Sequence, residues 1–183
     1  MKVISTDILD VKLLEPVVHE DPRGYFFEAF NQETFSQAIG ENFEVCQINE
    51  SCSSKETIRG MHLQQDPYSQ AKLVRVVYGE VYDVAVDCRR HSETFGKYIG
   101  VILSSSNKKQ LWIPRGFAHG FQVISDKCVL NYQVDSKYAP RSEIIIDAFD
   151  EDVGINWPIK SKAKMSDKDR NGVSFAAIFD RGT

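Results

Sequence analysis

The sequence predicts a mainly β domain, a jelly-roll barrel with a few short helices. Two observations indicate this fold. Short β-type runs recur along the chain, and Gly, Pro or polar stretches separate them at intervals of roughly ten residues. A barrel or double-sheet arrangement would also protect the edges of so many strands. The predicted strands cover residues 73–78, 81–87, 98–103, 110–113, 120–124, 129–134 and 143–148.

The clearest strand pattern is V-Y-D-V-A-V-D over residues 81–87. Successive side chains of a strand point to opposite faces, so Asp83 and Asp87 share one face while Tyr82, Val84 and Val86 share the other. Gly79 and Glu80 precede this run and form a turn signal, which predicts that it continues from the strand over 73–78.

Helices are few. Asn31 is a suitable N-cap for a helix over Gln32–Ile39, and Gly40 is a suitable residue to end it. Ser166 is the expected cap of a second short helix that begins at Asp167.

Length and composition predict one soluble domain over residues 1–183. The hydrophobic fraction of 42% and the charged fraction of 26% are typical of globular proteins. A net charge of −4 argues against nucleic acid or a membrane surface as a partner. We find neither a signal-peptide pattern nor an apolar run long enough to span a membrane.

The cysteines indicate the compartment. Cys46, Cys52, Cys88 and Cys128 form no C-x-x-C pair and no zinc-finger spacing, so we expect free, buried thiols. A reducing cytoplasm is the expected location.

The segment P-R-G-F-A-H, which ends at His119, resembles the second motif of the cupin superfamily. Metal-binding cupins also need an H-x-H pair followed by Glu, and the corresponding region here offers only His62, between Met61 and Leu63. A set of three ligands is therefore incomplete, and no metal is predicted. Taken alone, His119 equally fits a hydrogen-bonded histidine beneath the rim of the barrel.

Polar, reactive side chains also gather in the stretch I-R-G-M-H-L-Q, residues 58–64. Histidine can act as a general base near neutral pH, although an isolated His62 more often is a satisfied core residue. Arg59 and His62 would point to opposite faces of a regular strand, so a turn or bulge at Gly60 is needed to bring both to one pocket. Arg59 and Arg23 are suited to pyrophosphate oxygens, or else are surface charges.

These stretches together identify a resemblance. D-P-R-G-Y-F-F-E, Q-I-N-x-S, I-R-G-M-H-L-Q, K-L-V-R-V-V-Y-G-E-V-Y-D-V-A-V-D and L-W-I-P-R-G-F-A-H-G-F closely resemble the dTDP-4-dehydrorhamnose 3,5-epimerase family. The resemblance runs in order from about Asp21 to Asp169. It implies a cupin fold, an isomerase that acts on a dTDP-linked keto sugar, and no cofactor. No G-x-G-x-x-G fingerprint is present.

By position, the resemblance assigns His62 as catalytic base and Asp169 as the carboxylate that orients it. Tyr132 is implied to be the acid on the other face of the sugar, and Lys72 the cation that stabilises the enolate oxygen. Tyr138 is implied to stack on thymine. The remaining implied substrate contacts are Arg23, Glu28, Gln47, Asn49, Arg59, His119, Glu143 and Lys168. Singly, Asp169 also fits a helix N-terminus, Tyr132 a barrel-filling residue and Tyr138 a partner of Pro140.

The leading functional hypothesis is inversion at both C3 and C5 of dTDP-4-dehydro-6-deoxy-D-glucose, giving dTDP-4-dehydro-L-rhamnose for dTDP-L-rhamnose biosynthesis. A C3 mono-epimerase of the same fold is the alternative. More distant alternatives are a cupin-type 3,4-ketoisomerase, which normally shows two closely spaced histidines, and a non-catalytic nucleotide-sugar-binding cupin. The resemblance also implies a homodimer with exchanged N-terminal strands, in which Arg23 and Glu28 serve the neighbouring pocket.

Overall fold

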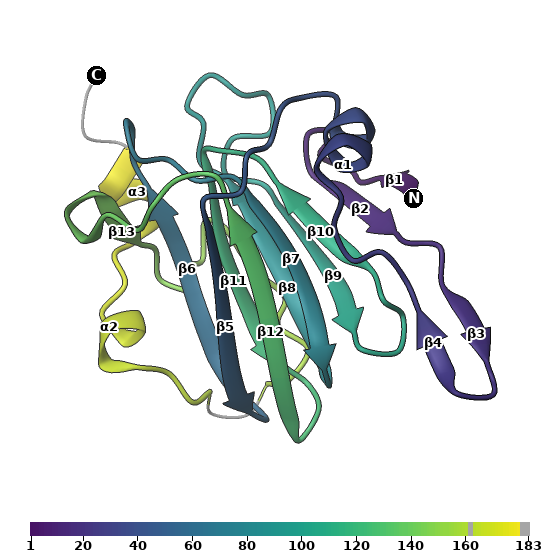
Figure 1. The fold of residues 1–183 in the computed structure, drawn as a ribbon. Coiled ribbons are helices and arrows are strands. Elements are labelled where there is room, and N and C mark those ends of the chain that lie inside the picture. The colour runs from purple at the N-terminus through teal and green to yellow at the C-terminus, as the bar shows by residue number, and fades with distance from the viewer. Residues whose placement is uncertain (161–162, 180–183) are drawn as a thin grey trace.

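The computed structural model describes residues 1–160 and 163–179 (Figure 1). The strands are β1 (Lys2–Ser5), β2 (Lys12–Glu15), β3 (His19–Asp21), β4 (Gly24–Phe26), β5 (Gln47–Ser54), β6 (Ile58–Gln64), β7 (Lys72–Tyr78), β8 (Glu80–Asp87), β9 (Tyr98–Ser104), β10 (Gln110–Ile113), β11 (Phe117–Val123), β12 (Lys127–Val134) and β13 (Glu143–Ile145). The helices are α1 (Gln32–Ile39), α2 (Asp167–Arg170) and α3 (Phe175–Phe179), with a 3₁₀ turn η1 at Pro140–Ser142.

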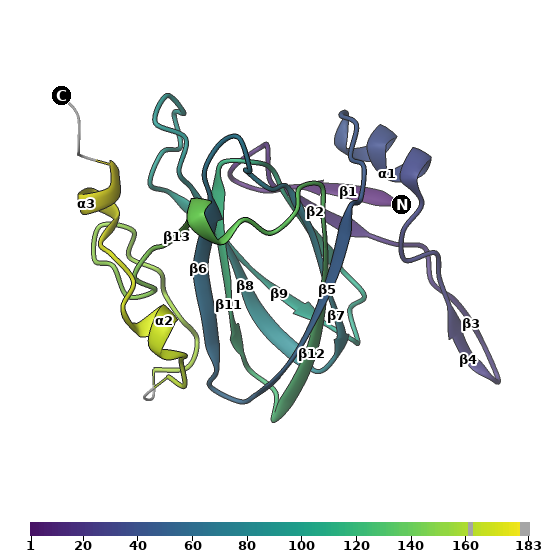
Figure 2. The same ribbon diagram turned by 60° about the vertical axis from the view of Figure 1, so that its left-hand side comes forward.

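The strands form two large antiparallel sheets. One has the order β1-β2-β10-β7-β12-β5 and the other the order β13-β6-β11-β8-β9, while β3 and β4 form a separate hairpin. Figure 2 shows the two large sheets facing each other, with the C-terminal segment outside the five-stranded sheet. The mainly β, jelly-roll fold predicted from the sequence is confirmed.

The main core lies between the two sheets. Val74 and Leu130 of the six-stranded sheet share it with Ala85 and Phe121 of the five-stranded sheet, and all four are buried. Burial of such side chains stabilises the fold by roughly 1.5–3 kcal/mol for each large one.

Both faces of β8 are buried, for different reasons. Val84 and Val86 point outward and pack against Trp157 and other apolar residues of the C-terminal segment. Asp83 and Asp87, on the opposite face as the alternation predicts, are both 0% exposed. Two buried carboxylates on one strand require specific partners, because desolvation of an unpaired charge is costly.

Part of the outer face of the six-stranded sheet, near β10, is covered by α1, which forms as its end residues predict. Asn31 Oδ1 accepts a hydrogen bond from the Thr34 amide at 3.1 Å, and Gly40 ends the helix with φ of +82°. Phe35 of α1 packs edge-on against Trp112 of β10, with ring centroids 5.4 Å apart. The predicted helix and both of its ends are thus confirmed.

Several elements differ from the expectation. The strand expected over 120–124 begins earlier, at Phe117, and the strand expected over 143–148 ends at Ile145, after which Ile146 forms a single bridge with Val173. The strands β1 to β6 and the helix α3 were not predicted. The thiols are free as expected, but Cys46 and Cys52 are exposed, so the expectation that all four are buried is wrong for these two.

The β3–β4 hairpin projects away from the sheets (Figures 1 and 2). Its Tyr25 and Phe26 are 56% and 72% exposed.

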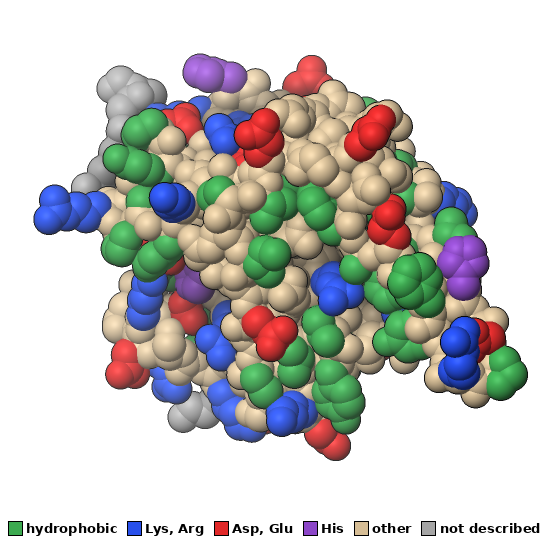
Figure 3. All heavy atoms as spheres, viewed as in Figure 1, with side chains coloured by type: hydrophobic (Ala, Val, Ile, Leu, Met, Phe, Trp, Pro, Cys, Tyr) green, Lys and Arg blue, Asp and Glu red, His purple; other side chains and the backbone are tan. Residues whose placement is uncertain are grey.

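On the face shown in Figure 3, basic and acidic side chains are interspersed. Among the described residues, no helix has both the length and the apolar character needed to cross a membrane.

Candidate active site

A β-bulge on β6 shapes the interior of the five-stranded sheet. His62 lies opposite His119 and Arg59 opposite Phe121, so three steps along β6 match two along β11. Gly60 adopts φ of +118°, and a Cβ at this position would lie 2.6 Å from the Gly120 Cα. The bulge predicted at Gly60 is confirmed. Because of it, Arg59 and His62, which are three residues apart, lie on the same face of the sheet.

His62 is held by Asp169. The His62 Nε2 atom lies 2.6 Å from Asp169 Oδ1, and 32% of the His62 side chain stays exposed to a ligand. The Asp169 amide donates to Ser166 Oγ at 3.1 Å, which confirms Ser166 as the cap of α2. Burial raises the pKa of Asp169, but the hydrogen bond and charge of His62 lower it further, and the net pKa lies below its usual value. An ionised Asp169 leaves the His62 Nδ1 atom free to accept a proton.

Lys72 supplies a buried ammonium at the start of β7. The residue is 7% exposed, and its Nζ atom lies 3.5 Å from the His62 carbonyl oxygen. Burial lowers the pKa of Lys72 to about 8, against the opposing charges of Asp83 and Glu143. With that pKa the side chain is predominantly cationic at pH 7, although much more easily deprotonated than a surface lysine.

Tyr132 of β12 brings a phenol to the same interior. It pairs with Asn49 of β5, and its ring centroid lies 6.4 Å from that of His119. Burial raises the pKa of Tyr132, while the charge of Arg59 partly opposes the rise. The hydroxyl therefore keeps its proton at neutral pH, as a general acid must before it reacts.

His119 is a buried, neutral imidazole. Its Nε2 atom lies 2.9 Å from Asp83 Oδ1, and the residue is 6% exposed. Burial lowers the pKa of His119, the charge of Asp83 opposes this, and the charges of Lys72 and His62 reinforce it. His62, His119, Lys72 and Tyr132 thus lie within one electrostatically connected cluster.

A second group of side chains forms the rim. The Tyr138 hydroxyl donates to Glu143 Oε2 at 2.9 Å, and Lys168 Nζ donates to both Glu143 and the Tyr138 hydroxyl. Gln47 Nε2 donates to Asn49 Oδ1 at 2.7 Å and Gln47 Oε1 accepts from the Tyr138 amide at 3.4 Å. Because 49% of Tyr138 is exposed, its ring is available for a flat ligand.

Arg23 and Glu28 are not brought to this cluster within the same chain. Arg23 lies on the β3–β4 hairpin, pairs with Asp21 at 2.6 Å and has a side chain that is 90% exposed. Glu28 accepts from Asn31 Nδ2 at 3.2 Å. The hairpin lies across the molecule from β6 and β13 in both ribbon views (Figures 1 and 2).

Sequence reasoning missed two residues that organise the site. Asp83 was noted only for its face on a strand, yet it holds His119. Gln64 is 6% exposed, donates to the Tyr68 and Lys137 carbonyls and accepts from the Ala139 amide, so it ties two loops together. A polar residue inside an apolar strand was the available signal for both.

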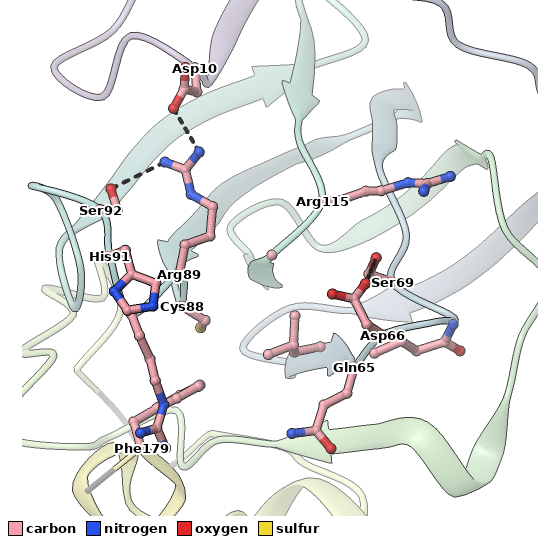
Figure 4. Close-up of a pocket in the computed structure, with 14 residues that line it drawn as sticks. Asp10, Gln65, Asp66, Ser69, Cys88, Arg89, His91, Ser92, Arg115 and Phe179 are labelled. Atoms are coloured by element: carbon pink, nitrogen blue, oxygen red, sulfur yellow. Dashed lines mark hydrogen bonds and ion pairs between the residues drawn. The ribbon is translucent and has the colours of Figure 1, made fainter. Parts of the chain in front are cut away.

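A large hollow lies at one end of the sheets (Figure 4). It has a volume of about 1130 Å³ and is lined by loops after β6, β8 and β10 and by Phe179. Its central Arg89 is engaged by Asp10, Asp87 and Ser92, which makes it a structural cation. His62, Lys72, Tyr132 and Asp169 are not among the residues that line this hollow.

The fold and the cluster define a class of protein. It is a two-sheet β protein whose interior holds groups suited to proton transfer, beside a buried cation that can stabilise a negatively charged oxygen. A sequence model of the dTDP-4-dehydrorhamnose 3,5-epimerase family matches residues 5–177, and the chain belongs to this family. The predicted family membership is confirmed.

Individual relatives agree with this assignment. The dTDP-4-dehydrorhamnose 3,5-epimerase of Shigella flexneri is 50% identical over 175 residues, covering 96% of each chain. The structure of the Legionella pneumophila dTDP-6-deoxy-D-glucose-3,5-epimerase, in complex with dTDP-4-keto-L-rhamnose, superposes with a TM-score of 0.94 at 41% identity, covering 97% of this chain and 94% of that one. A 3′-monoepimerase from Streptomyces bikiniensis, in complex with dTDP-quinovose, gives a TM-score of 0.88 at 35% identity, with coverages of 94% and 87%.

Proposed function

We propose that this protein inverts C3 and C5 of dTDP-4-dehydro-6-deoxy-D-glucose, giving dTDP-4-dehydro-L-rhamnose for dTDP-L-rhamnose biosynthesis. The observation that carries the proposal is the His62–Asp169 pair, which shares an interior with the Lys72 ammonium and the Tyr132 phenol. Family membership supports the substrate class.

The reaction begins with removal of a proton beside the C4 ketone. His62 Nδ1 is the proposed base, because its Nε2 faces Asp169. As the C–H bond breaks, the electron pair moves toward the C4 oxygen, and Lys72 is the cation proposed to stabilise that oxyanion. One preorganised donor of this kind contributes on the order of 3–4 kcal/mol to the barrier. The reaction moves only protons and needs no redox cofactor.

Inversion requires a proton from the opposite face of the enolate. Tyr132 is the proposed acid, because its hydroxyl keeps its proton at neutral pH and its ring lies beside His119 on the sheet that faces β6. General acid and general base steps each contribute about 10²–10⁴ in rate. Base and acid on different sheets can reach different faces of a flat ring held between them.

The nucleotide supplies binding energy remote from the reacting carbons. We assign the exposed ring of Tyr138 to stacking on thymine, with Gln47 and Asn49 beside it. Arg59, His119, Glu143 and Lys168 are the remaining proposed contacts to sugar and phosphates. These roles follow from position in the cluster and from the family.

Inversion at C3 alone is the second candidate, and the 3′-monoepimerase neighbour supports it. The same base, acid and cation serve both reactions, so ring positioning decides which carbons are reached. Incubation with the dTDP-4-keto-6-deoxy sugar in heavy water, followed by NMR, tests the proposal. Deuterium at C3 and C5 is expected. Deuterium at C3 alone would establish the mono-epimerase, and no exchange would refute both.

A non-catalytic sugar-binding role predicts a different outcome. A His62→Ala variant should lose turnover while still binding dTDP in a calorimetric titration. Full turnover by this variant would contradict the proposed base, whereas wild-type protein that binds dTDP but exchanges no deuterium would favour the binding role.

We further propose a homodimer and a cytoplasmic location. The projecting hairpin, with Tyr25 and Phe26 exposed, is suited to lie against a second copy of the chain, where Arg23 and Glu28 would reach the partner's cluster. Apolar side chains exposed on a projecting hairpin favour such an interface. Four free cysteines support a reducing compartment.

A further inference from the structure

Asp83 is a fully buried carboxylate with an unused acceptor. It is 0% exposed, and its Oδ1 faces His119 Nε2 at 2.9 Å. Its Oδ2 atom is buried and has no hydrogen-bond partner among the described residues. Leaving a buried acceptor without a donor costs free energy, so a carboxylate in this position calls for a compensating role.

The groups around Lys72 indicate what that role is. Lys72 Nζ donates to the His62 carbonyl, and Lys72 interacts electrostatically with the His119 ring and with the carboxylates of Asp83 and Glu143. Glu143 is already bonded to Lys168 and Tyr138, which share its negative charge. Among the described residues, the ion pairs within 4.0 Å do not include Lys72. Asp83 is therefore the carboxylate whose charge is least committed elsewhere.

We propose that Asp83 is a positioning residue for the epimerisation, a role that rests on the proposed function: its carboxylate keeps Lys72 an ammonium and fixes His119 as the imidazole that carries its proton on Nε2. Asp83 touches neither substrate nor reacting atoms and acts through these two side chains.

The geometry explains why this arrangement suits an enolate. A lysine locked in a direct ion pair would present a neutralised pair to the substrate. Asp83 instead supports the charge of Lys72 without an ion pair within 4.0 Å, so no carboxylate occupies the Nζ donors. Burial alone favours neutral lysine, and Asp83 is the larger of the two opposing charges on the Lys72 pKa. With its Nε2–H directed to a carboxylate, His119 presents Nδ1 as an acceptor, suited to a sugar hydroxyl.

The test is the pH–rate profile of Asp83→Asn, which keeps the size of the side chain and removes the charge. The alkaline limb should move to lower pH by about one unit, and kcat should fall about threefold at pH 7.5 and about tenfold at pH 9, with KM nearly unchanged. Asp150→Asn, which neutralises a buried carboxylate in the C-terminal segment, should leave the alkaline limb in place. An unmoved limb in Asp83→Asn would overturn the proposal.

Two further measurements need no turnover. Long-range ¹H–¹⁵N NMR of the wild-type protein reports the His119 tautomer, and Nε2–H is expected; a proton on Nδ1 alone would overturn the assignment. Titration of the Lys72 ammonium by NMR in wild type and Asp83→Asn, without substrate, should show a lower pKa in the variant. That result together with no epimerase activity would refute the proposed function and the role of Asp83 in epimerisation, while confirming that the Asp83 carboxylate supports the charge of Lys72.

Discussion

The Nε2 atom of His62 lies 2.6 Å from Oδ1 of Asp169, although 107 residues separate them in the sequence. The contact depends on the start of α2. There Ser166 Oγ accepts a hydrogen bond from the Asp169 amide, which fixes the Asp169 carboxylate beside β6. The orientation of the proposed base is therefore set by a helix of four residues outside the five-stranded sheet.

Asp169→Asn should lower kcat by about 10²- to 10⁴-fold, because an amide no longer holds His62 in the required tautomer or stabilises its protonated form. Steady-state kinetics check this. Asp167→Asn is the matched control, since Asp167 is exposed on the same helix. A kcat of Asp169→Asn within a factor of three of wild type would contradict the pairing as a catalytic feature.

Tyr132→Phe should separate proton removal from inversion. His62 remains able to remove a proton and return a deuteron from its own face, so solvent deuterium should still enter the substrate. Formation of the inverted product should fall by about 10²–10⁴-fold, because the acid of the other face is missing. NMR in heavy water measures both events. Tyr78→Phe, at an exposed tyrosine, is the control. Product formation at the wild-type rate would exclude Tyr132 as the acid.

Lys72→Met should stabilise the protein while abolishing turnover. One pH unit of pKa change is about 1.4 kcal/mol, so lowering the pKa from 10.5 to about 8 corresponds to roughly 3 kcal/mol of burial cost at neutral pH. Loss of the counter-charge for Asp83 offsets part of the gain, and we expect about 1–3 kcal/mol more stability at pH 7.

The sign of the pH dependence follows from the same pKa. Between about pH 8 and 10.5 the unfolded chain holds a proton on Lys72 that the folded chain has lost, so wild-type stability rises with pH in this window relative to the variant. Urea unfolding at pH 7 and pH 10 should show the advantage of Lys72→Met shrinking. A variant that is less stable than wild type at pH 7 would contradict the burial cost.

The elements that the sequence predicted are those whose own residues determine them. The alternation of β8 and the caps of α1 are local signals. β5 was missed because Q-I-N-E-S-C-S-S lacks an apolar face; its eight residues form a strand through backbone pairing with β12. Which strand a segment pairs with, and in which register, cannot be predicted from that segment alone.

The resemblance proposes the members of the candidate site, whereas the contacts between them could not be predicted. The family resemblance named His62 and Asp169, and the bulge at Gly60 followed from strand geometry. The Asp83–His119 contact depends on the register of β8 against β11, and neither residue signals it alone. The distance of Arg23 from the cluster depends on the direction in which the β3–β4 hairpin projects, and no local sequence pattern predicts that direction.

Gly60→Ala should destabilise the fold strongly. The methyl group would meet the Gly120 Cα and the His119 carbonyl at 2.6 and 2.7 Å, in addition to the strain of positive φ, and we expect a loss of about 3–5 kcal/mol. Gly24→Ala is the matched control: its φ is +126° but no atom lies within 4 Å of the added Cβ, so a loss of about 1–2 kcal/mol is expected. Equal losses in urea unfolding would contradict the close approach of β6 and β11.

If the hairpin serves the neighbouring cluster, two inactive variants should complement each other. In a mixed dimer of Arg23→Ala and His62→Ala, one site receives His62 from one chain and Arg23 from the other, and is complete. Random reassociation of equal amounts makes half of the dimers mixed, so about a quarter of wild-type activity should return.

The matched control mixes His62→Ala with Tyr132→Phe. Both residues belong to the interior of one chain, so no mixed dimer contains a complete site and no activity should return. Light scattering establishes that dimers are present in each mixture. Recovery in the first mixture and not in the second would distinguish exchange of the hairpin from simple association of two self-contained subunits, because self-contained subunits cannot repair each other's missing arginine.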